Sequence, residues 1–93
     1  MAEATVRVAT AHGSRYLQQL CKHWAHKLDV TFTPEEGTVR FAEAIAVMRA
    51  EPEALVVRIT AEEEAVLERM KGVVATHLDR FAFKEAPLGF DWS

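Results

Sequence analysis

The chain has 93 residues, of which 49% are hydrophobic and 27% charged, and its formal net charge is −3. This length and composition predict one globular domain, residues 1–93, with a single modest core. The negative charge argues against a protein whose main task is to bind nucleic acid or an anionic membrane, and no apolar run approaches the roughly 20 residues that span a bilayer. Cys21 is the only cysteine, which excludes an internal disulfide, and the first ten residues lack a signal-peptide pattern. We therefore expect a cytoplasmic protein.

The first predicted elements are a strand and a long helix. In "TVRVA" (5–9), Val6 and Val8 alternate with polar residues, which is the period of a half-buried strand. Thr10 can then cap a helix that begins near residue 11 or 12 and ends near Leu28. One narrow stripe of this helix should face the core, and it comprises Leu17, Leu20, Cys21, Trp24 and Leu28.

The middle of the chain predicts four strands. In residues 29–42, Val30 and Phe32 alternate before a turn, and Val39 and Phe41 alternate after it, which indicates a hairpin. The turn, Pro34 to Gly37, has a proline suited to its second position and a glycine suited to a left-handed conformation. Two further strands are predicted at 44–50 and 54–60, joined by 51–53.

A second helix and a closing strand complete the predicted fold. Residues 60–63 fit a capping box, so the helix should begin at Thr60 and end near Phe81. In the last residues Leu88, Phe90 and Trp92 alternate as a short strand. The order β-α-β-β-β-β-α-β favours an α+β two-layer sandwich, in which both helices cover one face of an antiparallel sheet.

The stretch "CKHWAHKL" (21–28) is the first candidate site. It places His23 and His26 three residues apart, on the side of the predicted helix that points away from the core stripe. Imidazole is a common ligand of zinc and of other late transition metals, but a structural zinc site needs four ligands. Three interpretations stay open: a solvated helix face, a surface that binds a ligand or partner, and a metal site.

The other histidines do not complete a metal site in the predicted fold. His12 lies about 16 Å from His23 along a continuous helix, and His77 should face the core from the second helix. Asp29 is the best local third ligand, unless a second molecule supplies one. A histidine on an apolar face is usually held by one hydrogen bond, although His77 could also act as a pH-sensitive switch.

A second candidate surface is the polar face of the predicted sheet. Single-stranded nucleic acid binds a polar sheet face that carries arginines together with stacking aromatic residues. Here Phe32, Phe41 and Phe90 stand at the alternate positions that should face the core. We therefore do not expect nucleic acid as a partner. The polar face should carry Thr5, Arg7, Thr31, Thr33, Arg40 and Arg58.

Catalytic patterns are absent from the sequence. Cys21 lies on the predicted buried stripe, where a thiol is usually inert. Ser14 has His12 nearby, but no third group orients a base and no nucleophile elbow is present. We expect neither an enzyme nor a bound cofactor.

Four motifs together resemble a known bacterial family. They are "HGSRYLQQLCKHWAHKL" (12–28), "TPEEGTVRF" (33–41), "HLDRFAFKE" (77–85) and the closing Trp92. The chain resembles, over nearly its whole length, the family catalogued as domain of unknown function 2218. The resemblance implies a small stand-alone protein with no established activity. Some relatives are joined to, or encoded beside, siderophore-interacting flavin reductases, which implies a link to ferric-siderophore handling.

The resemblance also implies a set of characteristic polar residues. Packing is sufficient to explain Tyr16 and Trp24, and Arg80 with Glu85 should form an ion pair or cap at the end of the second helix. The family positions match His12, Arg15, Tyr16, His23, Trp24, His26, Lys27, His77, Arg80 and Glu85. The predicted ligand-binding residues are those without a packing role, His12, Arg15, His23, His26 and Lys27, with His23 and His26 as the candidate metal ligands.

Two functions remain as hypotheses. In the first, a non-enzymatic binding module uses the basic, histidine-bearing helix to hold an iron chelate, another anionic small molecule, or a metal ion. In the second, the domain docks on a protein partner, such as a flavin reductase or a copy of itself. The sequence predicts no membrane partner in either case.

Overall fold

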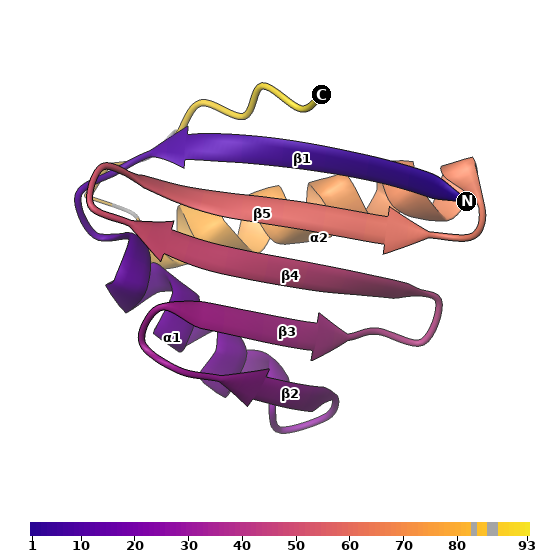
Figure 1. Cartoon of the computed structure of the whole chain (residues 1–93), viewed down its shortest axis with the longest axis horizontal. Helices are drawn as coiled ribbons and strands as arrows, with labels where there is room; N and C mark the ends of the chain where they lie inside the picture. Colours follow the sequence, from indigo (N-terminus) through magenta and orange to yellow (C-terminus); the bar gives the residue numbers. More distant parts are fainter. Residues whose placement is uncertain (83, 86–87) are drawn as a thin grey trace.

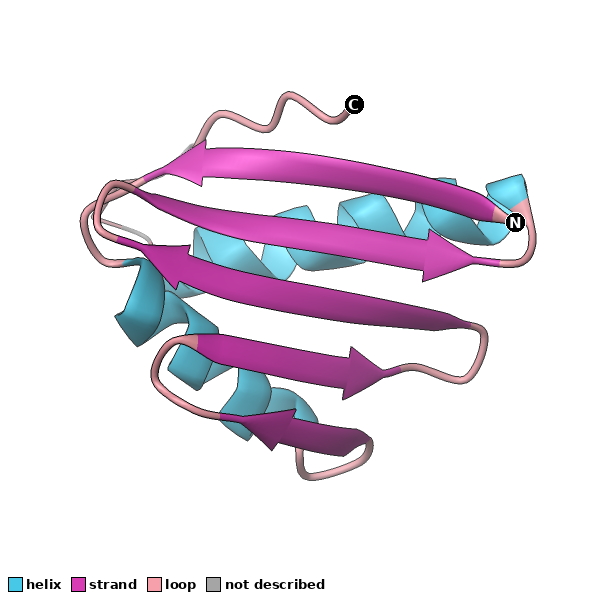
Figure 2. Ribbon diagram, in the orientation of Figure 1, coloured by secondary structure: helices cyan, strands magenta, loops and turns pink. Residues whose placement is uncertain are grey.

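The chain folds into two layers, a five-stranded antiparallel sheet and two helices that both lie on one of its faces (Figures 1 and 2). The structure is a computed structural model and describes residues 1–82, 84–85 and 88–93. The strands are β1 (Ala2–Ala9), β2 (Asp29–Phe32), β3 (Glu36–Arg40), β4 (Ala44–Glu51) and β5 (Ala54–Ala61), and the helices are α1 (Gly13–Trp24) and α2 (Glu64–Phe81). The predicted α+β sandwich with both helices on one face is confirmed.

The sheet has the order β1-β5-β4-β3-β2. Strands β2 to β5 follow one another as hairpins, and β1, which leads into α1, pairs with β5 at the other edge. Successive side chains point to opposite faces, as the alternation in the sequence predicted. One cross-strand row, Val6, Val57, Met48 and Gly37, faces the helices and is buried. The opposite face is not covered by either helix (Figure 1). In the described part of the chain, no helix is long and apolar enough to cross a membrane.

Helix α1 packs closely on β3 at Gly37. Leu17, Leu20 and Cys21 are fully buried on its inner side. A Cβ atom on Gly37 would lie 2.7 Å from the Cys21 sulfur and 3.3 Å from Leu17 Cδ2. Gly37 therefore belongs to β3 and leaves space for the helix, so its predicted role as a left-handed turn residue is wrong.

The turn between β2 and β3 is instead organised by a threonine. The Thr33 hydroxyl accepts hydrogen bonds from the backbone N–H groups of Glu35 (3.2 Å) and Glu36 (3.1 Å). The Thr33 N–H donates to the Glu36 carbonyl at 2.7 Å. A side-chain oxygen that accepts two backbone donors can close a turn without a left-handed residue.

Both helices are shorter than the sequence predicted. Helix α1 ends at Trp24, because the next residues form a turn in which the Lys27 and Leu28 N–H groups donate to the Trp24 carbonyl. The capping box at Thr60 is wrong, since Thr60 and Ala61 continue β5 and α2 begins at Glu64. Pairing with strands on both sides accounts for this difference, because a ladder satisfies more backbone groups there than a helix cap does.

The predicted closing strand is not formed as a strand. Residues 88–93 run as an extended segment beyond the free edge of β1 (Figure 1). Within the described segments, the backbone pairing of this segment with β1 is confined to Ser93, which exchanges two hydrogen bonds of 2.9 Å with Thr5. Leu88, Phe90 and Trp92 are half-buried and pack against the core. The alternation in the sequence therefore predicted which residues are buried, but not the backbone structure.

Replacing Gly37 by alanine should destabilise the protein. The new Cβ would clash with the Cys21 sulfur, and overpacking of this kind costs about 1–3 kcal/mol. The cost should be smaller in a Cys21→Ala background, which removes the clashing atom. The measurement is the free energy of unfolding in urea.

Gly72 provides the matched control. It lies in α2 with nothing within 4 Å of an added Cβ, so Gly72→Ala should stabilise the helix, by up to about 1 kcal/mol. Equal stability of Gly37→Ala and the wild type would show that α1 does not depend on this close approach.

Candidate functional site

The five predicted ligand-binding residues lie at opposite ends of α1. His12 and Arg15 are at its start, whereas His23 is in its last turn and His26 and Lys27 are in the turn that follows. The two ends are separated by about 16 Å at the rise of an α-helix. The structure therefore divides the predicted set into two places with different surroundings.

At the start of α1, polar side chains converge on the carboxylate of Glu85. The Tyr16 hydroxyl donates a hydrogen bond to it, and the Thr10 hydroxyl lies 3.1 and 3.2 Å from its two oxygens. The Thr10 hydroxyl also accepts from the His12 N–H at 3.0 Å. Tyr16 and Thr10 are buried, so this cluster satisfies two hydroxyl groups inside the protein. The predicted pairing of Glu85 with Arg80 is wrong.

The electrostatics of this cluster stabilise the ionised carboxylate. The hydrogen bond from Tyr16 is the main cause that lowers the pKa of Glu85 below its ordinary value. Loss of solvent around the carboxylate acts in the opposite direction, and Thr10 and the charge of His12 lower the pKa further. Burial, and next the hydrogen bond to Glu85, raise the pKa of Tyr16. Tyr16 therefore stays a neutral donor. The cluster links Glu85, which follows α2 in the chain, to the start of α1.

At the other end of α1 the structure forms a hollow of about 400 Å³. Trp24 supplies an apolar wall and is itself held by an edge-on contact with Phe41, at a ring separation of 5.2 Å. The predicted residues from this end all contribute to the hollow, which is lined by His23, Trp24, His26, Lys27 and Leu28. This end of α1 thus brings three of the five predicted residues together.

The same end of α1 contacts α2 through aromatic rings. The ring centroid of His23 lies 5.3 Å from that of His77 and 5.7 Å from that of Phe81, and the Trp24 centroid lies 5.3 Å from that of His77. The Nδ1–H of His77 donates to the carbonyl of Val73 at 2.7 Å, which is the hydrogen bond expected of a histidine on an apolar face. His23 was predicted to point only to solvent, and although it is exposed, its ring contacts α2.

Sequence reasoning missed the pairing of His23 with His77. A helical wheel describes one helix at a time and cannot show where a second helix crosses it. Across residues 1–82, 84–85 and 88–93, no group of three or more His, Cys, Asp or Glu side chains is arranged to hold a metal ion. Asp29, the candidate third ligand, forms an ion pair of 3.6 Å with Arg40 on β3.

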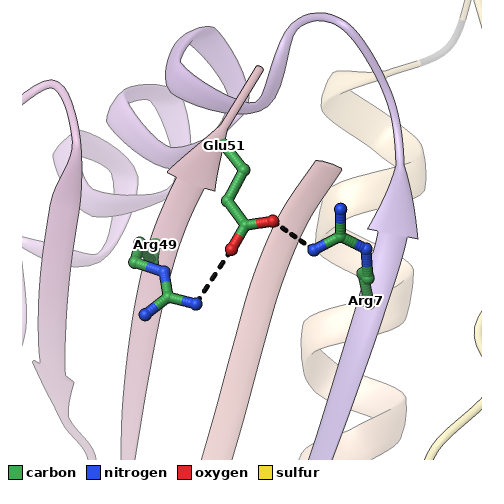
Figure 3. A network of polar contacts seen from close by, with 3 residues as sticks. All are labelled: Arg7, Arg49 and Glu51. Atoms are coloured by element: carbon green, nitrogen blue, oxygen red, sulfur yellow. Dashed lines mark hydrogen bonds and ion pairs between the residues drawn. The ribbon is translucent and has the colours of Figure 1, made fainter. Parts of the chain in front are cut away.

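The uncovered sheet face carries the arginines that alternation predicted, and it adds a network that sequence reasoning missed. Arg7 on β1 and Arg49 on β4 both contact the carboxylate of Glu51, the latter at 2.8 Å (Figure 3). Hydrogen bonds from Arg7 and then Arg49 lower the pKa of Glu51. Arg58 also lies on this face, where it helps to line a hollow of about 400 Å³.

These features define a class: a small α+β domain with an open antiparallel sheet, two covering helices and a histidine-lined hollow at the end of the first helix. Residues 5–93 match the model of a family described as "Uncharacterized protein conserved in bacteria (DUF2218)", and the chain belongs to that family. The fold is similar to the NMR structure of PA4090 from Pseudomonas aeruginosa, with 35% sequence identity and a TM-score of 0.85. That similarity covers 100% of this chain and 96% of the other. A comparison with curated proteins finds no match.

The Glu85 cluster should make stability depend on acid pH. A carboxylate whose pKa is lower in the folded than in the unfolded state contributes stability above the unfolded pKa and loses it as the pH falls through the folded value. The free energy of unfolding should therefore fall more steeply between about pH 5 and pH 2 in the wild type than in Glu85→Gln. Urea titrations across this range measure the difference.

Two further variants isolate the Tyr16 hydrogen bond. Tyr16→Phe removes the donor, so the pKa of Glu85, followed by carboxyl NMR, should rise. Glu3→Gln, at an exposed position on β1, serves as the control. An unchanged Glu85 titration in Tyr16→Phe would contradict the stated cause of its low pKa.

Proposed function

We propose that the protein is a cytoplasmic, non-enzymatic binding module for an anionic small molecule with an aromatic or apolar part, a ferric chelate being the leading example. The observation that carries the proposal is the hollow at the end of α1. It gathers His23, His26 and Lys27 against walls made by Trp24 and Leu28. Small-molecule sites commonly combine apolar walls with a few convergent polar groups in a volume of roughly 300–1,000 Å³.

Charge supports an anionic ligand. The protein as a whole has a net charge of −3, yet none of the five residues that line the hollow carries a carboxylate. Lys27 contributes a fixed cation, and the two imidazoles can donate hydrogen bonds or gain a proton. The hollow can therefore attract an anion although the protein as a whole is negatively charged.

Trp24 supports a ligand with an aromatic or apolar part. Its ring contacts the rings of Phe41 and His77, and only 7% of its surface is exposed, so it presents a small, rigid apolar surface to the hollow. A rigid apolar surface loses little conformational freedom when part of a ligand packs against it. A ferric siderophore fits this description, because such chelates are often anionic and cationic side chains can hold them without touching the iron.

Binding should be visible in the NMR signals of the two tryptophan indoles. The probe is 2,3-dihydroxybenzoate, first alone and then as its gallium(III) complex, a diamagnetic stand-in for the ferric one. The Trp24 indole signal should shift on titration, whereas that of Trp92, which lies beyond the β1 edge, should not. Lys27→Glu should weaken binding about tenfold, which corresponds to 1.4 kcal/mol.

Lys22→Glu is the matched control, since Lys22 is exposed on α1 but does not line the hollow. It should bind the probe as the wild type does. If the Trp24 signal stays fixed up to millimolar probe, or if both lysine variants weaken binding equally, the hollow is not a site for this class of ligand.

The open sheet face supports a second candidate function, docking of a second copy of the chain. Its hollow is lined by Arg49, Arg58, Glu36, Val47 and Val56 among others, and residues 62–64, which lead into α2, are three glutamates. Arg49 is paired with Glu51 of its own chain, but Arg58 forms no ion pair with any residue that the structure describes. Arg58 of one copy is therefore complementary in charge to the glutamates of another. Sedimentation velocity should then show a dimer that both Arg58→Glu and high salt weaken. A monomer at all concentrations would exclude docking of a second copy on this face.

A further inference from the structure

We propose that His23 and His77 together bind a late divalent transition-metal ion, such as Zn²⁺, across the contact between α1 and α2. The carrying observation is the separation of 5.3 Å between their ring centroids. Two imidazoles on one zinc ion, with Zn–N bonds of about 2.0–2.1 Å and a near-tetrahedral angle, have centroids roughly 5 Å apart. The folded chain thus already holds the two rings at the spacing that one ion requires.

The hydrogen bond of His77 prepares its ring for a metal. Its Nδ1 lies 2.7 Å from the Val73 carbonyl, so Nδ1 carries the proton and, in the neutral ring, Nε2 carries the free lone pair. Histidines that ligate metals usually donate their other N–H to a carbonyl or carboxylate in this way. Because Val73 lies one turn earlier on α2, this bond also fixes the direction of the ring.

His23 can adjust to the ion. It is exposed in the last turn of α1, and its ring plane is inclined by 48° to that of His77, so the two rings are not stacked face to face. Rotation about its Cβ–Cγ bond can change which of its nitrogens faces His77 without moving either helix. Trp24 and Phe81 flank the pair and shield part of it from water.

His77, and not His26, is the geometric partner of His23. The ring contact places His77 beside His23, whereas His26 lies past the last residue of α1 and makes no such ring contact with His23 in the described structure. Two protein ligands leave coordination positions open, which water or the oxygen atoms of a chelate can fill. The part of this inference that concerns a chelate rests on the proposed function, because His23 also lines the hollow.

The test is a titration of the metal-free protein with Zn²⁺ alone, followed by imidazole NMR and calorimetry. We expect micromolar binding, with shifts confined to His23, His77 and their neighbours. His23→Gln and His77→Gln should each weaken binding by at least about tenfold. The matched control is His12→Gln, which lies at the other end of α1 and outside the hollow, and it should retain wild-type affinity.

Three results would overturn the inference: wild-type affinity in His77→Gln, wild-type affinity in His23→Gln, or no binding below millimolar zinc. Amide spectra establish that the variants are folded, and His23 is exposed, so its replacement leaves the core intact. The free 2,3-dihydroxybenzoate titration contains no metal. Failure of zinc binding and failure of the proposed function are therefore observed separately.

Discussion

The missing side chain at Gly37 allows α1 to lie directly on β3, and the arrangement of the helical layer depends on that contact. The Cys21 sulfur occupies the space that a Cβ would need. Burial raises the pKa of Cys21 to about 11, so the thiol stays neutral and behaves as a small apolar group. A helix lifted from the sheet here would also carry Trp24 and His23 away from α2. The geometry at the end of α1 is thus set by a contact in the core.

The sequence predicted the strands well because each strand is buried on one side only. Val6 and Val8 in β1, or Val39 in β3, alternate with more exposed residues, and a period of two is typical of a strand with one buried face. Element ends were predicted less well because tertiary contacts decide them. Thr60 has the residue type of a helix cap, but strands on both sides of β5 offer its backbone better partners.

At the candidate site, too, the sequence indicated the residue types but not their contacts. Sequence reasoning selected His23 and Lys27, but it could not place His77 beside His23, because nothing periodic connects positions on two helices. It paired Glu85 with Arg80, which is close in sequence, whereas the structure pairs it with Tyr16, 69 residues away. A buried hydroxyl without an acceptor costs more than an exposed ion pair contributes, so the distant partner is preferred.

The two ends of α1 differ in whether their polar groups are already satisfied. At the start, the hydroxyls of Thr10 and Tyr16 are hydrogen-bonded to Glu85, and a negative charge near a helix N-terminus is favourable in itself. At the other end, Lys27 forms no ion pair with any residue that the structure describes, and the His77 ring keeps one nitrogen free of its bond to Val73. Donors and lone pairs that the fold does not use are the ones available to a ligand. The binding site that we propose therefore lies at the C-terminal end of α1, although the sequence places candidate residues at both ends.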